Sequence, residues 1–236
     1  MQKAAFITGT SRGIGKAIAE LLLYNAYQVF GYSRTNTIDH PNFIFTPINL
    51  FDLEKVRKIN FPKFNRAQVI LINNAARIGE IAPLDIKTAE GIITDYKLNI
   101  ITPTLLCANF INSFNDENKL IINISSGAAN STIPSWGTYC ATKAALDALT
   151  NVIAAEKHNN LKVYSISPGV VDTEMQAEIR SAHVDLFPYL AKFVNYYNNN
   201  ELEYPNIIAQ KLLYIIQNSN KFEQNIVSIR DIDINQ

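Results

Sequence analysis

One tyrosine and one lysine in the sequence are spaced as an acid–base pair would be on a helix. Tyr139 and Lys143 lie in the segment 136–143, which begins a helix-forming stretch. A phenol has a reference pKa of about 10 and is a poor acid and a poor base at neutral pH. Side chains at i and i+4 are neighbours on a helix, so the Lys143 ammonium can lie near the Tyr139 oxygen and favour phenolate. Of the 11 tyrosines only Tyr139 has lysine at i+4, but a chance spacing is the alternative at this point.

A glycine-rich turn near the N-terminus is typical of a dinucleotide-binding site. Residues 3–8 are apolar enough for a buried strand, and residues 16–24 carry apolar side chains at helical spacing. Between them lies Thr8-Gly9-Thr10-Ser11-Arg12-Gly13-Ile14-Gly15. Glycines let a backbone approach a pyrophosphate, and the start of the helix offers free amides and the positive end of its dipole. The spacing differs from Gly-x-Gly-x-x-Gly, and a plain tight loop is the alternative to a cofactor site.

Further motifs follow in the order found in short-chain dehydrogenase/reductases, a family that the sequence resembles over nearly its whole length. In chain order they are Thr8 to Gly15, Asn73-Asn74-Ala75-Ala76, Asn99, Ser125-Ser126, Tyr139 to Lys143 and Pro168-Gly169-Val170-Val171-Asp172-Thr173. Segments 126–129, 136–140 and 167–176 look like the bacterial benzil reductase and sepiapterin reductase branch of that family.

The resemblance implies hydride transfer from C4 of a nicotinamide to a carbonyl carbon. Tyr139 would protonate the developing alkoxide and Ser126 would hydrogen-bond the carbonyl oxygen. Lys143 would tune Tyr139 and bind the nicotinamide ribose. Asn99 would position a water that relays protons to Lys143, with a helix-interior asparagine bonded to backbone as the alternative. The cofactor-binding positions carried over from the family are Thr8, Gly9, Ser11, Arg12, Gly13, Ile14, Gly15, Ser33, Arg34, Asn49, Leu50, Asn73, Ala75, Tyr139, Lys143, Pro168, Gly169, Val171 and Thr173.

The residues after the second expected strand indicate NADP(H) as the cofactor. In relatives that use NAD, an acidic residue there accepts from the adenosine ribose hydroxyls and repels a 2′-phosphate. This chain has Ser33 and Arg34 instead, and Arg12 adds a second positive charge from the glycine turn. Arginine suits a bidentate grip on phosphate. Solvated surface charges are the alternative for both arginines.

Two positions depart from the family pattern. Asn49 stands where many relatives have aspartate, and its carbonyl oxygen can still accept from the adenine amino group. Ala76 replaces the glycine after Ala75. A methyl group there costs on the order of 1 kcal/mol if the backbone needs positive φ, and otherwise narrows the space beside the cofactor.

The substrate is indicated by the segment that follows the Pro-Gly motif, where family members fold a mobile lid. Between residues 174 and 204 lie Met175, Phe187, Tyr189, Leu190, Phe193, Tyr196 and Tyr197. With Trp136 they favour a flat or apolar carbonyl compound, and packing of the lid is the alternative for each. The branch points to a vicinal diketone or a pterin side-chain carbonyl. We favour the diketone, because no acid beyond Asp172 is placed to anchor a pterin.

Composition agrees with one NAD(P)-binding domain over residues 1–236. The 21 basic and 21 acidic residues balance, so nucleic acid and anionic membranes are not expected partners. Only Cys107 and Cys140 are present, which argues for a reducing compartment. The three histidines are scattered, so no metal site is expected. The N-terminal strand leaves no room for a signal peptide and no apolar run approaches a membrane span, which predicts a cytoplasmic protein.

Strands and helices alternate along the chain. We expect strands near 3–8, 27–32, 42–46, 68–72, 119–124, 161–167 and 225–229, and helices near 13–24, 52–59, 88–114, 138–157, 175–196 and 205–218. The asparagine-rich segment 195–200 is expected to be a surface loop. The alternation predicts an α/β fold, a Rossmann-like, doubly wound parallel sheet of about seven strands with helices on both faces. Ligands bind such sheets beyond the carboxyl ends of the strands, where the motifs fall.

Two non-enzymatic functions compete with a reductase: a cofactor-sensing regulator and an interaction module that uses the fold as a scaffold. Retention of Tyr139, Lys143, Ser126 and Asn99 argues against both. Family members pair through the helices holding Asn99 and Tyr139, so a homodimer or homotetramer is expected. The small apolar residues of segment 144–149 suit such a contact, and burial within a monomer is the alternative.

Overall fold

A parallel seven-stranded sheet forms the centre of the protein. The structure is a computed structural model that describes residues 2–64 and 68–234. The strands are β1 (Lys3–Thr8), β2 (Gln28–Ser33), β3 (Phe43–Pro47), β4 (Gln68–Asn73), β5 (Asn118–Ile124), β6 (Leu161–Ser167) and β7 (Ile226–Ser228). Their order across the sheet is β3-β2-β1-β4-β5-β6-β7, and every pairing is parallel. The predicted doubly wound α/β fold is confirmed.

The strand order reverses between β1 and β4. From β1 the chain builds outward through β2 to β3, then returns to pair β4 with the other side of β1. The loops leaving β1 and β4 therefore diverge to opposite faces of the sheet and leave a crevice beyond the strands' carboxyl ends. The glycine turn follows β1, and Asn73-Asn74 lies where β4 ends, so both reach this crevice.

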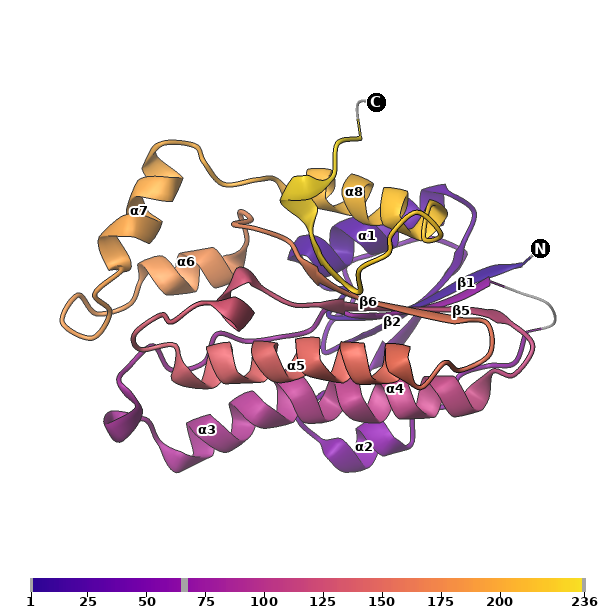
Figure 1. The fold of residues 1–236 in the computed structure, drawn as a ribbon, viewed down its shortest axis with the longest axis horizontal. Coiled ribbons are helices and arrows are strands. Elements are labelled where there is room, and N and C mark those ends of the chain that lie inside the picture. Colours follow the sequence, from indigo (N-terminus) through magenta and orange to yellow (C-terminus); the bar gives the residue numbers. More distant parts are fainter. Residues whose placement is uncertain (1, 65–67, 235–236) are drawn as a thin grey trace.

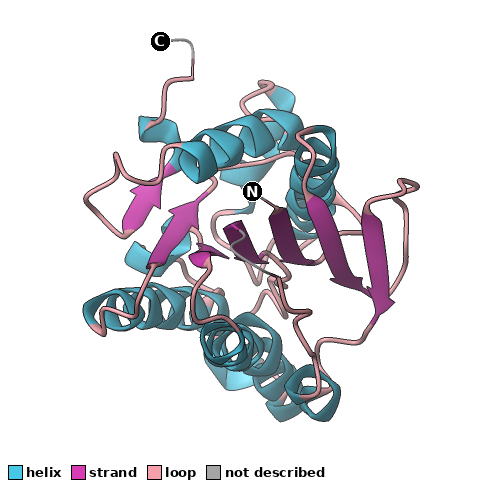
Figure 2. Ribbon diagram, turned by 90° about the vertical axis from the view of Figure 1, so that its right-hand side faces the viewer, coloured by secondary structure: helices cyan, strands magenta, loops and turns pink. Residues whose placement is uncertain are grey.

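Helices cover both faces of the sheet. On one face lie α1 (Gly13–Tyr24) and α8 (Pro205–Gln217), and on the other lie α2 (Leu53–Arg57), α3 (Ala89–Tyr96), α4 (Thr102–Ser113) and α5 (Gly137–Ala155). Figure 2 shows the sheet edge-on between the two layers. The remaining helices, α6 (Glu174–Arg180) and α7 (Leu190–Asn198), lie apart from both layers, beyond one edge of the stack (Figure 1).

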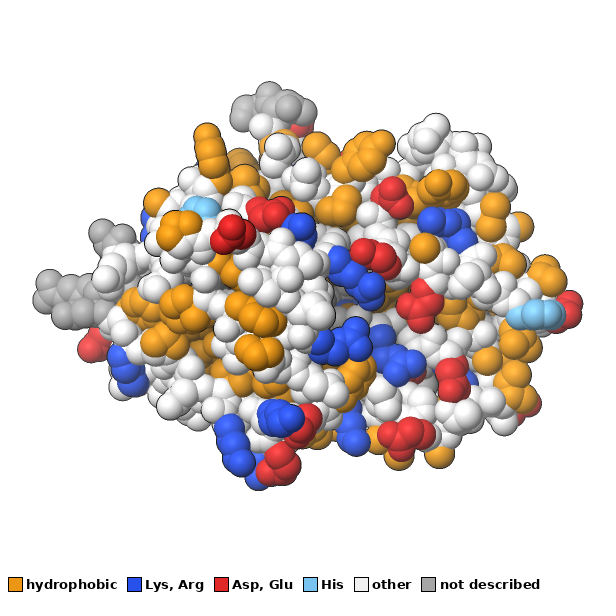
Figure 3. Space-filling model, turned by 180° about the vertical axis from the view of Figure 1, so that it is seen from behind, with side chains coloured by type: hydrophobic (Ala, Val, Ile, Leu, Met, Phe, Trp, Pro, Cys, Tyr) orange, Lys and Arg blue, Asp and Glu red, His pale blue; other side chains and the backbone are white. Residues whose placement is uncertain are grey.

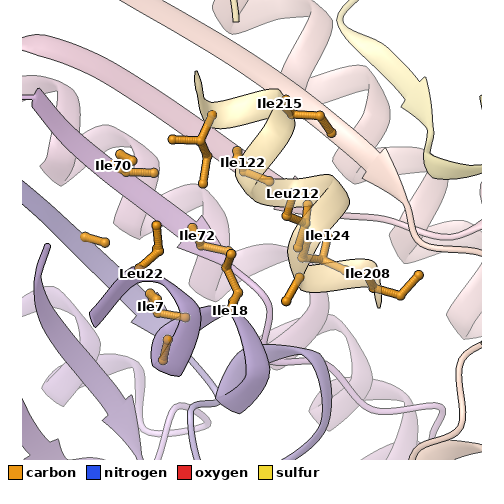
Figure 4. Close-up of a cluster of buried hydrophobic side chains, with 14 of the residues drawn as sticks. Ile7, Ile18, Leu22, Ile70, Ile72, Ile122, Ile124, Ile208, Leu212 and Ile215 are labelled. Atoms are coloured by element: carbon orange, nitrogen blue, oxygen red, sulfur yellow. The ribbon is translucent and has the colours of Figure 1, made fainter. Parts of the chain in front are cut away.

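Side chains of the central strands are apolar on both faces, because helices bury both. Ile7, Ile72 and Ile122 point toward α1 and α8, where they meet Ile18 and Leu212 (Figure 4). On the other face, phenylalanines pack edge to face, with the rings of Phe6 and Phe61 4.8 Å apart. Because these two apolar layers pack against both faces, the carboxyl ends of β1, β4, β5 and β6 lie together at one rigid edge of the sheet.

The helix predicted over 88–114 is interrupted by a π-helical segment, Lys97–Ile101. The amide of Thr102 donates to the carbonyl of Lys97, five residues earlier. Pro103 explains the interruption: it has no N–H for the carbonyl of Asn99, four residues earlier, and its ring clashes with that carbonyl in a regular helix. The predicted continuous helix is wrong at this point.

The helix predicted over 175–196 is also wrong, because two helices replace it. The first, α6, ends at Arg180, and α7 begins only at Leu190. Pro188 lies between them and disfavours helical backbone at Phe187. Asn195 to Asn198 belong to α7, so only the end of the asparagine-rich segment is a turn, with Asn200 at φ 55°.

Surface charge is mixed. One face carries a group of Lys and Arg side chains near its middle, with Asp and Glu among them (Figure 3). Over the described ranges, no helix is both long and apolar enough to cross a membrane. Among these described residues, no three or more His, Cys, Asp or Glu side chains lie close enough together to hold a metal ion.

Candidate active site

Two neighbouring cavities open beyond the carboxyl ends of the strands. The larger, about 460 Å³, is lined by the glycine turn and is called the glycine-turn cleft below. The smaller, about 260 Å³, is lined by Trp136, Phe193 and Tyr196 and is called the aromatic cavity. The residues that line both are Ile14, Ser125, Tyr139, Pro168, Thr173 and Met175. Tyr139 thus lies where the two cavities meet.

The glycine turn leaves backbone exposed toward the cleft. Gly9 and Gly13 have φ of 75° and 55°, a region that glycine enters without penalty. A Cβ on Gly15 would lie 2.2 Å from the carbonyl oxygen of Gly9, so α1 starts directly against the turn. No side chain caps the first turn of α1, and its free amides suit an anion. A pyrophosphate fits this cradle.

Three expected cofactor positions face the protein interior. Thr8 lines neither cavity, and its Oγ1 accepts from the amides of Asn74 and Ala75, at 3.0 Å each. Gly15 packs against the turn, and Asn73 donates to Asn123 at 2.8 Å. The cleft is instead lined by Asn74, whose Nδ2 donates to the carbonyl of Thr8 at 3.0 Å. Asn74 was missed, although it is part of the quoted motif.

The far end of the glycine-turn cleft has the polar groups expected for an adenosine. Ser33, Arg34, Asn49 and Leu50 line it. The side-chain oxygen of Asn49 accepts from the amide of Phe51 at 3.2 Å and keeps a second lone pair.

The acidic residues that line the described part of this cleft, Glu174 and Glu178, come from α6 rather than from the end of β2. Arg12 lies 3.8 Å from Glu174 in a solvent-exposed pair, which is too weak to commit the guanidinium. Arg12 and Arg34 therefore line the cleft as available positive charges.

Ala76 also lines the glycine-turn cleft, and its backbone lies outside the left-handed region. The loss of the family's glycine therefore brings no backbone strain. Its methyl group only reduces the width of the cleft.

The side chains of Tyr139 and Lys143 point to the same side of α5. The Lys143 ammonium lies 5.7 Å from the centre of the Tyr139 ring and donates to the carbonyl of Ile124, at the end of β5, at 2.7 Å. Lys143 lines only the glycine-turn cleft, whereas Ser126 lines only the aromatic cavity. The Tyr139 hydroxyl is 3.9 Å from the Met175 sulfur. The side chains of Tyr139, Lys143 and Ser126 thus surround the junction of the two cavities.

Burial dominates the titration of both groups. It raises the pKa of Tyr139 to about 12, while a hydrogen bond with Ser126 lowers it. Burial lowers the pKa of Lys143 to about 8, and the carboxylate of Asp147 raises it. The net lowering of the Tyr139 pKa that the neighbouring ammonium was expected to produce does not occur in these groups, because desolvation disfavours the charged form of both and outweighs it. Tyr139 is held as a neutral phenol, the form that can donate a proton.

Asn99 lies in the π-helical segment and is fully buried. Its Oδ1 accepts from the amide of Arg77 at 3.0 Å, and its Nδ2 donates to the carbonyl of Arg77 at 2.9 Å and to Thr142 at 3.3 Å. The side chain is therefore occupied in holding the cleft-lining backbone at Arg77. The carbonyl oxygen of Asn99 has no α-helical i+4 donor, because Pro103 has no N–H.

A buried charge network beside Asn99 was not predicted. Asp95, 1% exposed, accepts from the hydroxyl of Thr138 at 2.7 Å. Arg77 Nε lies 3.0 Å from the other Asp95 oxygen as an ion pair, although the angle does not make a hydrogen bond there. Lys87 also donates to Thr138, at 3.0 Å. The network ties the start of α5 to α3 and to the cleft-lining loop.

The aromatic cavity is walled by stacked rings. Trp136 lies edge-on to Tyr139, with ring centres 5.6 Å apart, and is nearly parallel to Phe187 at the same separation. The predicted substrate residues Trp136 and Met175 both line this cavity. So do Phe193 and Tyr196 of the expected lid, whereas Phe187 packs behind Trp136.

Three further expected cofactor positions, Pro168, Gly169 and Val171, line the aromatic cavity, and Pro168 lines the cleft as well. The cavity also contains Lys192 and Arg230, which sequence reasoning missed. No periodicity or motif connects these two residues with Tyr139.

Comparison with known proteins agrees with this geometry. Residues 3–184 match the family described as short chain dehydrogenase. The chain is 32% identical over 231 residues to "Benzil reductase ((S)-benzoin forming)" of Bacillus cereus, covering 89% of this chain and 92% of that protein. It is 35% identical over 162 residues to sepiapterin reductase of Bos taurus, covering 66% of this chain and 59% of that protein.

Solved structures share the fold. A short-chain dehydrogenase/reductase from Saccharomyces cerevisiae superposes with a TM-score of 0.83 at 21% identity, covering 97% of this chain and 96% of the other. A tyrosine-to-phenylalanine variant of ElxO with NADPH bound superposes with a TM-score of 0.79 at 25% identity, covering 97% of both chains. With its sheet order, its glycine turn and its Tyr139–Lys143 pair at the junction of two cavities, this chain belongs to the short-chain dehydrogenase/reductase family, whose members use nicotinamide cofactors.

Proposed function

We propose that this protein is an NADPH-dependent reductase of carbonyl compounds that converts a ketone or a vicinal diketone, such as benzil, into the hydroxy product. The observation that carries the proposal is the junction of the two cavities. The glycine-turn cleft fits a dinucleotide, the aromatic cavity fits a flat carbonyl compound, and the Tyr139 side chain lines both.

The side chains at the junction divide the work of a carbonyl reduction. When bound, the reduced nicotinamide would supply the hydride. Tyr139, a neutral phenol, would donate its proton to the oxygen that becomes negative, and the Ser126 hydroxyl would hold that oxygen by a hydrogen bond. Lys143, fixed on the carbonyl of Ile124, would hold the ribose hydroxyls beside Tyr139. The carbonyl of Asn99 would hold a water that returns a proton toward Lys143.

Charge at the adenosine end supports NADPH. Arg12 and Arg34 line the cleft, and the described residues following β2 include no carboxylate before Asp39. A 2′-phosphate would find two guanidinium groups and no nearby acid on that strand end. The NADPH in the ElxO structure is consistent with this preference in a relative.

The lining of the aromatic cavity supports the diketone over a pterin. A pterin ring presents N–H donors, which a carboxylate would accept. Within the described residues, no Asp or Glu lines the aromatic cavity, and Asp172 lines neither cavity. The benzil reductase similarity, which extends over most of both chains, favours the same substrate class.

We propose that the protein acts in the cytoplasm, because Cys107 and Cys140 are both free thiols.

The test is oxidation of NADPH or NADH by the purified protein with benzil. We expect turnover with kcat/KM higher for NADPH than for NADH. Arg34→Asp should reverse that order, by at least about tenfold in the ratio, because the carboxylate repels the 2′-phosphate and accepts from the ribose hydroxyls. Arg57→Asp, on the exposed surface of α2, is the matched control and should leave the ratio unchanged. Equal use of both cofactors would contradict the NADPH assignment. Absence of turnover with every aromatic ketone tested would contradict the reductase function itself.

A further inference from the structure

The geometry points to a natural substrate that is, among the ketones proposed above, one with a carboxylate beside its reducible carbonyl: an aromatic or apolar oxo acid. This inference rests on the proposed reductase function and narrows its substrate class. In the reaction the carbonyl carbon gains the hydride of the reduced cofactor and the oxygen gains the proton of Tyr139. The C=O becomes CH–OH, the cofactor is oxidised, and the carboxylate is unchanged.

The charge of the aromatic cavity has one sign. Of the described residues that line it, the charged ones are Lys192 and Arg230, and no carboxylate lies among them. The chain as a whole is balanced, with 21 basic and 21 acidic residues, so this imbalance is local. Over the ranges 2–64 and 68–234, neither Lys192 nor Arg230 forms an ion pair with an acidic side chain. Both charges remain available to a ligand.

Arg230 projects from a fixed backbone. It lies in the short 3₁₀ helix Ile229–Asp231 that follows β7. The Ile229 side chain is buried, and its carbonyl accepts from the Lys211 ammonium of α8 at 3.1 Å. The amide of Arg230 donates to the hydroxyl of Ser228 at 3.3 Å. The position of the guanidinium is therefore limited by a well-anchored chain rather than by a free C-terminal tail.

Gly169 makes room for the Arg230 side chain. A Cβ on Gly169 would lie 3.3 Å from Arg230 Nε, and the glycine's φ of 77° also disfavours any other residue. Gly169 directly follows Pro168, which lines both cavities. The guanidinium thus lies against the backbone next to the junction where the carbonyl must bind. A planar fork of N–H donors at this place suits a carboxylate better than a neutral ring.

Lys192 comes from a separate element, α7, and adds a second positive charge. Its ammonium lies 5.8 Å from the ring centre of Tyr196, and its neighbour Phe193 is buried in the cavity wall. The aromatic wall and the two positive charges together suit an amphipathic ligand that has an apolar body and an anionic end.

These charges lie apart from the positive groups of the glycine-turn cleft, although Arg230 packs against Gly169, an expected cofactor position. Arg230 and Lys192 line the aromatic cavity but not the glycine-turn cleft, whose positive groups are Arg12, Arg34, Arg77 and Lys143. An effect of Arg230 on the KM for NADPH would contradict this separation.

The experiment compares phenylglyoxylate with its methyl ester, which share the ketone and the ring and differ in charge. Wild type, Arg230→Met, Arg230→Lys and the surface control Arg57→Met are assayed with NADPH. In Arg230→Met, kcat/KM for the acid should fall about tenfold or more through KM, while the ester changes less than about twofold. The kcat/KM of Arg230→Lys for the acid should lie between the values of wild type and Arg230→Met, because lysine keeps the positive charge but lacks the planar fork of donors. Arg57→Met should match wild type with both substrates.

Salt provides a second measurement. Raising the ionic strength should lower kcat/KM of wild type for the acid several-fold and leave the ester nearly unchanged. Equal effects of Arg230→Met on acid and ester, a raised KM for NADPH instead, or reduction of the ester but not the acid would each overturn the inference. In the last case the reductase itself stands. Failure of acid, ester and benzil alike would overturn the proposed function and this inference together.

Discussion

The burial of Tyr139 favours the protonated form of its hydroxyl. At a pKa of about 12 it is protonated throughout the physiological range, so it is ready to give a proton to a carbonyl oxygen. Carbonyl reduction starts from this form, and the reverse oxidation starts from the phenolate of the same side chain.

Removing this hydroxyl tests its role directly. We expect Tyr139→Phe to lower kcat by at least about 10²-fold, the range for loss of a general acid, without changing the affinity for NADPH. Phenylalanine fills the same space against Trp136, so the fold should be kept. Steady-state kinetics and cofactor fluorescence titration measure the two quantities, and wild-type turnover in the variant would refute the assignment.

Lys143 should impose the upper limit of the pH profile. Its pKa of about 8 lies below the ordinary 10.5, so the ammonium is present below about pH 8 and is lost as the pH rises through that value. We expect kcat/KM for reduction to fall above about pH 8, while Tyr139 remains protonated. A profile measured from pH 6 to 10 checks this, and a flat profile up to pH 10 would contradict it.

Some residues of the site could not have been found from the sequence. Tyr139, Lys143 and Ser126 follow a short motif, and the structure brings them to one junction. Arg230 lies far along the chain and reaches the cavity only because β7 pairs with β6 and so brings the end of the chain beside Pro168 and Gly169. Such proximity depends on strand order, which no local pattern of residues encodes.

At the scale of elements, strands were predicted better than helices. Strands at 3–8 and 161–167 agree with β1 and β6, and in β1 the nearly continuous apolar run is typical of a parallel strand buried on both faces. The helices predicted over 88–114 and 175–196 failed at Pro103 and Pro188. Each predicted range contains one of these prolines, whose missing N–H and fixed ring disrupt a regular helix.

The charge network that joins α3 to α5 should be important for stability. Asp95→Ala removes the acceptor of Thr138 and leaves Arg77 without its ion-pair partner. We expect a loss of about 2–4 kcal/mol in the free energy of unfolding, which is at the low end for a broken buried pair because Arg77 is partly exposed. Urea denaturation measures it. Asp85→Ala, at an exposed position, is the control and should cost less than about 0.5 kcal/mol.

For the whole molecule, we propose that two copies associate through α4 and α5. Ala144, Ala148 and Val152 are exposed at successive turns of α5, and Val152 is 55% exposed. Small apolar side chains allow two helices to approach closely. We expect light scattering to give about twice the chain mass of 26.5 kDa. Ala148→Glu should give the monomer with an unchanged circular dichroism spectrum, and Val184→Glu, on an exposed loop, should not. A monomeric wild-type protein would contradict this interface.

The position of α6 has a kinetic consequence. Its Glu174 and Glu178 face the glycine-turn cleft, its Gln176 and Ile179 face the aromatic cavity, and its Met175 faces both. This short helix therefore borders both cavities, and an outward movement of it would expose both ligands together. Release of the alcohol and of the oxidised nucleotide should then be slow, which would appear as a pre-steady-state burst of NADPH consumption; absence of a burst would show that release is not the slow step.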